Sequence, residues 1–229
     1  MNNASAENPN AFDDASIAAI YHAIHNRRDI REFIPGALPV GLLDRLYAAA
    51  HAAPSVGYMQ PWRLIHVSDA TLREGMAQLV EEERLRTATE LPSRTAEFLK
   101  LKVEGIKTCA EILVVALMDG CENHLFGKRT MPEMALASAA CAIQNIWLAA
   151  RAEGIGMGWV SFFEPAALAH LFAMPPGAKP IAILCLGHVA QFADQPTLEA
   201  LGWGQRLPLA SVVFENRWPE DAQPTPTAY

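Results

Sequence analysis

The stretch NRRDIREF (residues 26–33) places three arginines around one aspartate in a chain that is acidic overall. If this stretch is extended, alternate side chains share a face, and one face then carries Arg27, Asp29 and Arg31. Glu32 points the other way, so it neutralises neither arginine. Guanidinium groups bind phosphates or planar imide edges through paired donors. The row therefore predicts a site for an anionic ligand, and a self-neutralising run on a solvated surface is the structural alternative.

The same row makes a prediction about the charge of its carboxylate. Arg27 and Arg31 flank Asp29, and nearby positive charge lowers the pKa of a carboxyl group. We therefore expect Asp29 to be held ionised.

A second candidate is the loop APSVGYMQPW (residues 53–62), which has proline near both ends and glycine inside. Ser55 and the loop amides offer hydrogen bonds to a heterocycle, and Gly57 allows close approach of the backbone. A simple turn between a helix and a strand is the alternative explanation.

Two further stretches contain polar groups among apolar residues. In GMGWVSFFEP (residues 156–165), Gly156 and Gly158 leave room for a flat ligand and Ser161 offers a hydroxyl and an amide. Alternatively, this is a strand end that packs aromatic side chains in the core. Near the C-terminus, Arg206 has no acidic residue close to it, which suggests an anionic partner.

Composition limits the class of protein. The chain has 229 residues, 51% of them apolar and 19% charged, with a net charge of -7. These values are typical of a globular domain, and the negative charge argues against nucleic acid as a partner. The four cysteines form no CxxC pair, and no histidine spacing predicts a metal site. The absence of a signal peptide and of any membrane-spanning run predicts a cytoplasmic protein with no membrane partner.

The order of apolar patterns predicts the architecture. Residues 1–14 are expected to be a disordered leader, 15–218 a single domain and 219–229 a flexible tail. The first helix should bury the face formed by Ile17, Ile20, Tyr21 and Ile24 and stop near Asn26. Four strand candidates alternate with helices, which predicts an α+β fold with a central mixed sheet flanked by helices on both faces. The charged segment 70–105 is expected to be lid-like.

The stretch 133–154 predicts a long helix that is apolar nearly all round and closes with Arg151 and Gly154. Such a helix must be covered on every side. It is therefore expected to form the core of the domain or half of a dimer interface.

Three of these stretches together resemble the FMN-dependent nitroreductase superfamily: RRDIREF (27–33), PSVGYMQPW (54–62) and RLPL (206–209). The resemblance extends from about Ser16 to Trp218. It implies a nitroreductase-like fold and a homodimer whose long helices form the dimer core, with FMN sites at the interface. Where that family usually has serine or threonine, this chain has Asp29. Asp29 together with SVGYMQPW (55–62), FGKRTMPEM (126–134) and GMGWVSFF (156–163) resembles one branch of the family. That branch uses oxygen to fragment reduced FMN into 5,6-dimethylbenzimidazole, the lower ligand of vitamin B12, and erythrose 4-phosphate.

The resemblance also implies roles for individual residues. Arg27 and Arg206 hold the FMN phosphate, Arg31 faces the pyrimidine edge, and Ser55 lines the ring system. Tyr58 replaces the family's asparagine, which puts that hydrogen bond in question. Asp29 is the expected general base and acid, with Ser161 as its catalytic partner. The full set expected to contact the flavin is Arg27, Arg28, Asp29, Ile30, Arg31, Ser55, Met59, Ser161 and Arg206.

Three functions remain open at this stage. In the first, reduced FMN is a substrate, molecular oxygen is the co-substrate, and a flavin reductase or NAD(P)H supplies the electrons. In the second, the protein is an ordinary NAD(P)H-dependent nitroreductase or flavin reductase. In the third, it is a non-catalytic flavin-binding module. Asp29 favours the first, because a carboxylate beside the flavin has no evident use in hydride transfer.

Overall fold

The computed structural model describes residues 8–118 and 129–219. The expected leader and tail fall mostly outside these ranges, so the predicted domain limits stay predictions. The helices are α1 (Asp14–Asn26), α2 (Leu42–His51), α3 (Ala70–Thr89), α4 (Thr95–Phe98), α5 (Met134–Ala152), α6 (Pro165–Leu171) and α7 (Thr197–Ala200), with 3-10 turns η1 (Val56–Tyr58) and η3 (Leu209–Ser211). The strands are β1 (Trp62–His66), β2 (Glu111–Met118), β3 (Gly156–Val160) and β4 (Ala178–Gly187).

The four strands form one sheet in the order β1-β2-β4-β3. Its three ladders are all antiparallel. In the described part of the chain, the parallel component of the expected mixed sheet is limited to an isolated bridge between Asp29 and Met157. The sequence pattern predicted the strands because apolar runs mark burial. It could not predict their direction, because a run buried on both faces looks the same either way.

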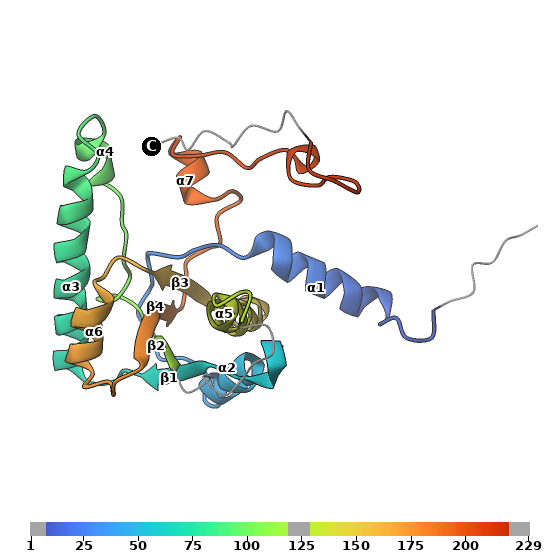
Figure 1. Cartoon of the computed structure of the whole chain (residues 1–229), viewed down its shortest axis with the longest axis horizontal. Helices are drawn as coiled ribbons and strands as arrows, with labels where there is room; N and C mark the ends of the chain where they lie inside the picture. Colours follow the sequence, from blue (N-terminus) through green and yellow to red (C-terminus); the bar gives the residue numbers. More distant parts are fainter. Residues whose placement is uncertain (1–7, 119–128, 220–229) are drawn as a thin grey trace, which may run out of the picture.

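Helices cover both faces of the sheet, as predicted (Figure 1). One apolar cluster packs α3 and α6 against one face, with Met76 and Leu168 fully buried. The other packs α2 and α5 against the opposite face, with Leu46 and Ile143 fully buried. The strand residues alternate between the clusters, as the period of a strand requires. Figure 1 shows α1 and the chain after β4 extending away from this layered body.

Within one chain α5 is not buried all round, so of its two expected places the core of the domain is excluded and half of a dimer interface stays a prediction. The buried residues of α5 are Ser138, Ala139, Ala142, Ile143, Ile146, Trp147 and Ala150. On the remaining surface Cys141 is exposed and Leu136 is 46% exposed. The apolar face of α1 behaves in the same way, since Ala23 is its buried residue and Tyr21 is 59% exposed. The helices form as predicted, but no residue of the described ranges 8–118 and 129–219 covers these faces.

The charged segment 70–105 divides into two structural parts. Its first part is α3, which is anchored in the core by Met76, Val80 and Ala88 and is therefore a structural helix. Its second part, around α4, borders the large cleft described below. The lid-like role predicted for the whole segment is therefore kept only for residues 90–105, as a prediction.

Candidate active site

A cleft of about 1640 Å³ lies where three segments of the chain meet. One wall is the arginine segment, which we define as residues 27–31. The second is the end of α3 with the chain through α4 to Val103, and the third is residues 189–206. The volume exceeds the roughly 300–1,000 Å³ of an ordinary small-molecule pocket. The cleft can therefore take a large ligand and still leave room at its open side.

The arginine segment is held against the edge of the sheet. The Ile30 amide donates to the Met157 carbonyl at 3.0 Å, and the Ile34 amide donates to the His188 carbonyl at 2.9 Å. These main-chain bonds fix an extended conformation beside β3. The residues of both predicted faces, Arg28 and Glu32 as well as Arg27 and Asp29, nevertheless line the cleft, so a single ligand-facing row stays a prediction.

Two glycines of β3 make this close approach possible. A Cβ atom added at Gly158 would lie 2.1 Å from the Ile30 carbonyl oxygen, and one at Gly156 would lie 2.4 Å from a Val189 methyl group. Both distances are far too short for real atoms. The expectation that Gly156 and Gly158 make room for a flat ligand is wrong in this respect, because the space they leave is filled by the protein's own chain.

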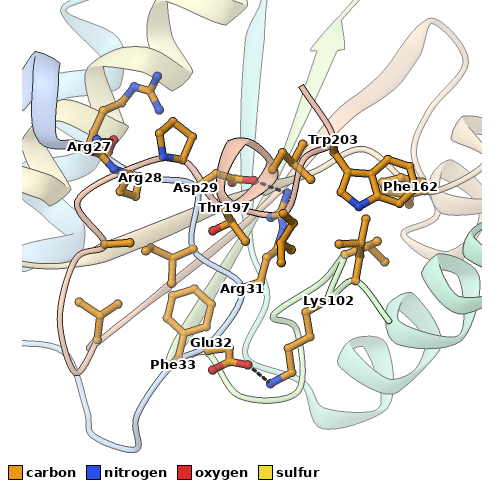
Figure 2. A pocket seen from close by; sticks show the side chains of 18 of the residues that line it. Arg27, Arg28, Asp29, Arg31, Glu32, Phe33, Lys102, Phe162, Thr197 and Trp203 are labelled. Carbon is orange, nitrogen blue, oxygen red and sulfur yellow. Dashed lines mark hydrogen bonds and ion pairs between the residues drawn. The ribbon is translucent and has the colours of Figure 1, made fainter. Parts of the chain in front are cut away.

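Asp29 is fixed by two contacts at the wall of the cleft (Figure 2). Its Oδ1 accepts from the Trp159 amide at 2.9 Å, and its Oδ2 forms an ion pair with Arg31 Nη2 at 2.7 Å. The side chain keeps 44% of its surface exposed. Burial raises the pKa of Asp29, and this outweighs the lowering by Arg31, by the Trp159 amide and by Arg27. The prediction of a pKa lowered by flanking arginines is therefore wrong in direction, because desolvation dominates.

Two arginines of the segment are engaged by the protein itself. Arg31 Nη2 also donates to the Trp159 carbonyl at 2.7 Å, while its Nη1 is buried without a partner. Arg28 donates to the carbonyls of His25 and Asp194. Arg28 thereby joins the end of α1 to the chain after β4. Its observed contacts are structural, and its predicted contact with a flavin remains a prediction.

Arg27 and Arg206 have their guanidinium groups free for a ligand. Both line the cleft, and in the described part of the chain no acceptor is hydrogen-bonded to either group. Arg27 stacks on the ring of Trp147, with its Cζ 4.6 Å from the ring centroid. Among the described residues, neither side chain is paired with a carboxylate at short range. Both could therefore serve an anion, and the predicted site for an anion stays a prediction.

Ser55, Met59 and Ser161 are not among the residues that line the cleft of the single chain. The Ser55 hydroxyl accepts from the Gln60 amide at 3.1 Å, and Met59 is buried. Ser161 is exposed and directly precedes Phe162, which does line the cleft. The single chain therefore brings Arg27, Asp29, Arg31 and Arg206 together and leaves the loop at 53–62 apart from them.

Several residues that line the cleft were missed in the sequence. Trp203 packs edge-on against Phe98, and Phe98 contacts Phe162. Lys102 forms an ion pair with Glu32 at 2.9 Å across the cleft (Figure 2). No short motif marks Phe98 or Lys102, whereas Phe162 lies in the candidate stretch 156–165. Trp203 lies three residues before Arg206. The unpaired arginine was therefore the one sequence signal that could have pointed to Trp203.

Comparison with known proteins identifies the family of the chain. The family model described as the Nitroreductase family matches residues 24–188. A 5,6-dimethylbenzimidazole synthase from Rhodobacter capsulatus is 35% identical over 200 residues, covering 86% of this chain and 96% of the relative. One from Rhodospirillum rubrum is 35% identical over 184 residues, covering 80% and 87%.

Solved structures support the fold. Iodotyrosine deiodinase bound to FMN and 3-iodo-L-tyrosine superposes with a TM-score of 0.69 at 19% identity, covering 87% of this chain and 100% of that one. An NADPH:FMN oxidoreductase from Vibrio harveyi complexed with NAD+ gives 0.67 at 21% identity, covering 88% and 79%. The chain thus belongs to the Nitroreductase family of oxidoreductases, and three of the relatives it resembles are 5,6-dimethylbenzimidazole synthases.

Proposed function

We propose that this protein uses molecular oxygen to fragment reduced FMN into 5,6-dimethylbenzimidazole and erythrose 4-phosphate, with reduced FMN as a substrate. The observation that carries the proposal is Asp29, a carboxylate with a raised pKa held at the wall of the cleft by the Trp159 amide and Arg31. The names of the similar synthases support the same reaction.

The residues of the cleft fit FMN in kind. The phosphate needs cationic donors, and Arg27 and Arg206 have donors that no described residue binds. The ring system needs an apolar wall, which the aromatic side chains of Phe98, Phe162 and Trp203 offer. Arg31 is also expected at the pyrimidine edge, although its Nη2 is bound to Asp29 and the Trp159 carbonyl and its Nη1 is buried. Reduced FMN would supply the electrons and the carbon skeleton of the product.

Asp29 is suited to moving protons in such a reaction. Breaking the ring and the ribityl chain requires several proton removals and returns, and a carboxylate whose pKa lies above its ordinary value is a better base and a more usable acid. The Trp159 amide and Arg31 fix the orientation of the carboxylate, so its free edge faces the cleft. Ser161 is proposed to orient the reacting group by hydrogen bonding from its hydroxyl or its amide.

We further propose that the site is completed by a second copy of the chain. The loop carrying Ser55 packs at the start of α5, where the Val56 amide donates to the Ser138 hydroxyl at 3.2 Å. The arginine segment packs near the other end of α5, where Trp147 donates to the Arg28 carbonyl at 3.2 Å. Pairing two α5 helices antiparallel would bring one copy's Ser55 loop beside the partner's arginine segment. It would also cover the exposed apolar faces of α1 and α5. Sedimentation that shows only a monomer at working concentration would contradict this part.

The reaction is tested by incubating the purified protein with chemically reduced FMN in air and measuring 5,6-dimethylbenzimidazole by chromatography and mass spectrometry. We expect the product to form without nicotinamide, since a separate flavin reductase or NAD(P)H is needed only to reduce the flavin. Oxidised FMN and hydrogen peroxide as the sole products would overturn the proposal. NAD(P)H-driven reduction of a nitro compound would then favour the nitroreductase alternative, and tight FMN binding with neither activity would favour a binding module.

A further inference from the structure

Trp147, on the buried face of α5, makes two contacts with the arginine segment and one with β3. Its indole face lies under the Arg27 guanidinium, with 4.6 Å from Cζ to the ring centroid. Its Nε1 donates to the Arg28 carbonyl at 3.2 Å. Its ring meets that of Trp159 at a centroid distance of 6.4 Å. Because the side chain is only 9% exposed, these contacts fix the plane of the indole.

The Arg27–Trp147 pair differs from the other arginine–aromatic pairs in the described residues. Arg94 stacks on Trp203 at 3.6 Å, but its Nε is bound to Glu97 at 3.0 Å. Arg151 stacks on Phe192, but it donates to the Asn26 carbonyl. Arg27 has a ring beneath it and, in the described chain, no hydrogen-bond acceptor. Its donors therefore remain available at the cleft.

We propose that Trp147 is a positioning residue for phosphate recognition, because its indole face presents the Arg27 guanidinium to the phosphate end of FMN. This inference rests on the proposed FMN site. Free arginine side chains have many rotamers, and ordering one on binding weakens the affinity. A guanidinium already stacked on a fixed aromatic face loses less freedom when the phosphate arrives.

The test compares two ligands that differ only in the phosphate, FMN and riboflavin. Dissociation constants are measured by flavin fluorescence for the wild type and for Trp147→Leu, Trp147→Phe, Arg27→Ala and the double variant Arg27→Ala/Trp147→Leu. Trp147→Leu should weaken FMN binding about five- to tenfold, the range of a partly desolvated cation–π contact, and change riboflavin binding by less than about twofold. Trp147→Phe keeps a ring face and should lie between.

The double variant separates positioning from a general loss of structure. Without Arg27 there is nothing to position, so adding Trp147→Leu to Arg27→Ala should leave the ratio of FMN to riboflavin affinity unchanged. Ile146→Ala is the matched control: it removes the neighbouring, fully buried side chain of the same helix and apolar cluster. It should lower the melting temperature without changing the ligand ratio.

Three results would overturn the inference: equal losses for FMN and riboflavin in Trp147→Leu, additive effects of the two substitutions on the ratio, or a wild type with no preference for FMN. If Trp147→Leu does not fold, the same criteria apply to Trp147→Phe. A wild type that prefers FMN but makes no 5,6-dimethylbenzimidazole would refute the proposed reaction while leaving the role of Trp147 intact.

Discussion

The arginine segment (residues 27–31) and the C-terminal segment (residues 197–218) both line the cleft with arginines, but they are held by different contacts. In the arginine segment, the Ile30 amide donates to Met157 of β3. Just after the segment, the Ile34 amide donates to His188, which directly follows β4. The C-terminal segment buries Trp203, whereas Leu209 is 75% and Trp218 is 73% exposed. In Figure 1 this second segment runs apart from the sheet and its helices.

This difference separates two kinds of site residue. The arginine segment is held in place within one chain, because β3 and its glycines leave space for it. The C-terminal segment carries apolar side chains that one chain leaves uncovered, and large exposed apolar patches mark contact surfaces. Arg27, Asp29 and Arg31 should therefore be preorganised, whereas Arg206 should depend on the second copy.

The strongest test of the preorganised segment is Asp29→Asn. Asparagine has nearly the same shape and can still accept from the Trp159 amide, so FMN binding should persist. Product formation should fall by about 10²–10⁴-fold, the usual contribution of a general acid or base. Single-turnover formation of 5,6-dimethylbenzimidazole from reduced FMN gives the rate. A normal rate in this variant would mean that Asp29 does not transfer the protons.

The pH dependence of the reaction tests the same carboxylate. If Asp29 must be ionised to act as a base, the rate should fall about tenfold for each pH unit below its pKa. Because burial raises that pKa above its ordinary value of 3.8, the acidic limb should begin above that of an exposed aspartate. The limb should be absent from the residual activity of Asp29→Asn.

The raised pKa also predicts a change in stability with pH. A carboxyl group with a raised pKa in the folded state binds its proton more tightly there than in the unfolded chain. Its contribution to the free energy of unfolding therefore decreases as the pH rises from 3.8 through the raised value. Over that window the wild type should lose stability relative to Asp29→Asn. Thermal unfolding of both proteins across the same pH series measures this, and parallel curves would contradict it.

A matched pair of glycine substitutions tests how the two segments are held. An added methyl group at Gly158 meets the Ile30 carbonyl at 2.1 Å, whereas at Gly204 it meets nothing within 4 Å. Gly158→Ala should destabilise the protein by about 1–3 kcal/mol and weaken FMN binding, because the arginine segment must shift. Gly204→Ala should change stability by less than about 0.5 kcal/mol. If the two substitutions lower the melting temperature equally, the arginine segment is not held more tightly than the C-terminal segment.

The smallest expected effect concerns the ion pair between Glu32 and Lys102. Both side chains are more than half exposed, at 76% and 59%, so Glu32→Gln should cost less than about 1 kcal/mol of stability. If residues 90–105 close over the cleft, the same change should raise the rate of FMN release by a small factor in stopped-flow measurements. An unchanged release rate would show that the ion pair between Glu32 and Lys102 does not hold residues 90–105 closed over the cleft.

Much of the architecture followed from the sequence alone. The end of the first helix at Asn26, the long helix of residues 133–154 and the buried strands were predicted from periodicity, glycine and proline, because these signals act within a few residues. The motif around Asp29 indicated the family for the same reason: its residues are neighbours in the chain. The antiparallel ladders and the uncovered face of α5 could not be predicted this way, since both depend on partners distant in the sequence or absent from the chain.

For the candidate site, the sequence determined which groups are present: the row of Arg27, Asp29 and Arg31 and the isolated Arg206. Only the tertiary structure decided what surrounds them. It desolvated Asp29 at the wall of the cleft and so raised its pKa, although the side chain stays 44% exposed and local charge alone predicted the opposite. It also used Gly158 to seat the arginine segment, and it placed Trp147 of a helix more than a hundred residues away under Arg27. The physical reason is that desolvation and packing depend on everything that surrounds a group, whereas charge and spacing can be read from its neighbours in the chain.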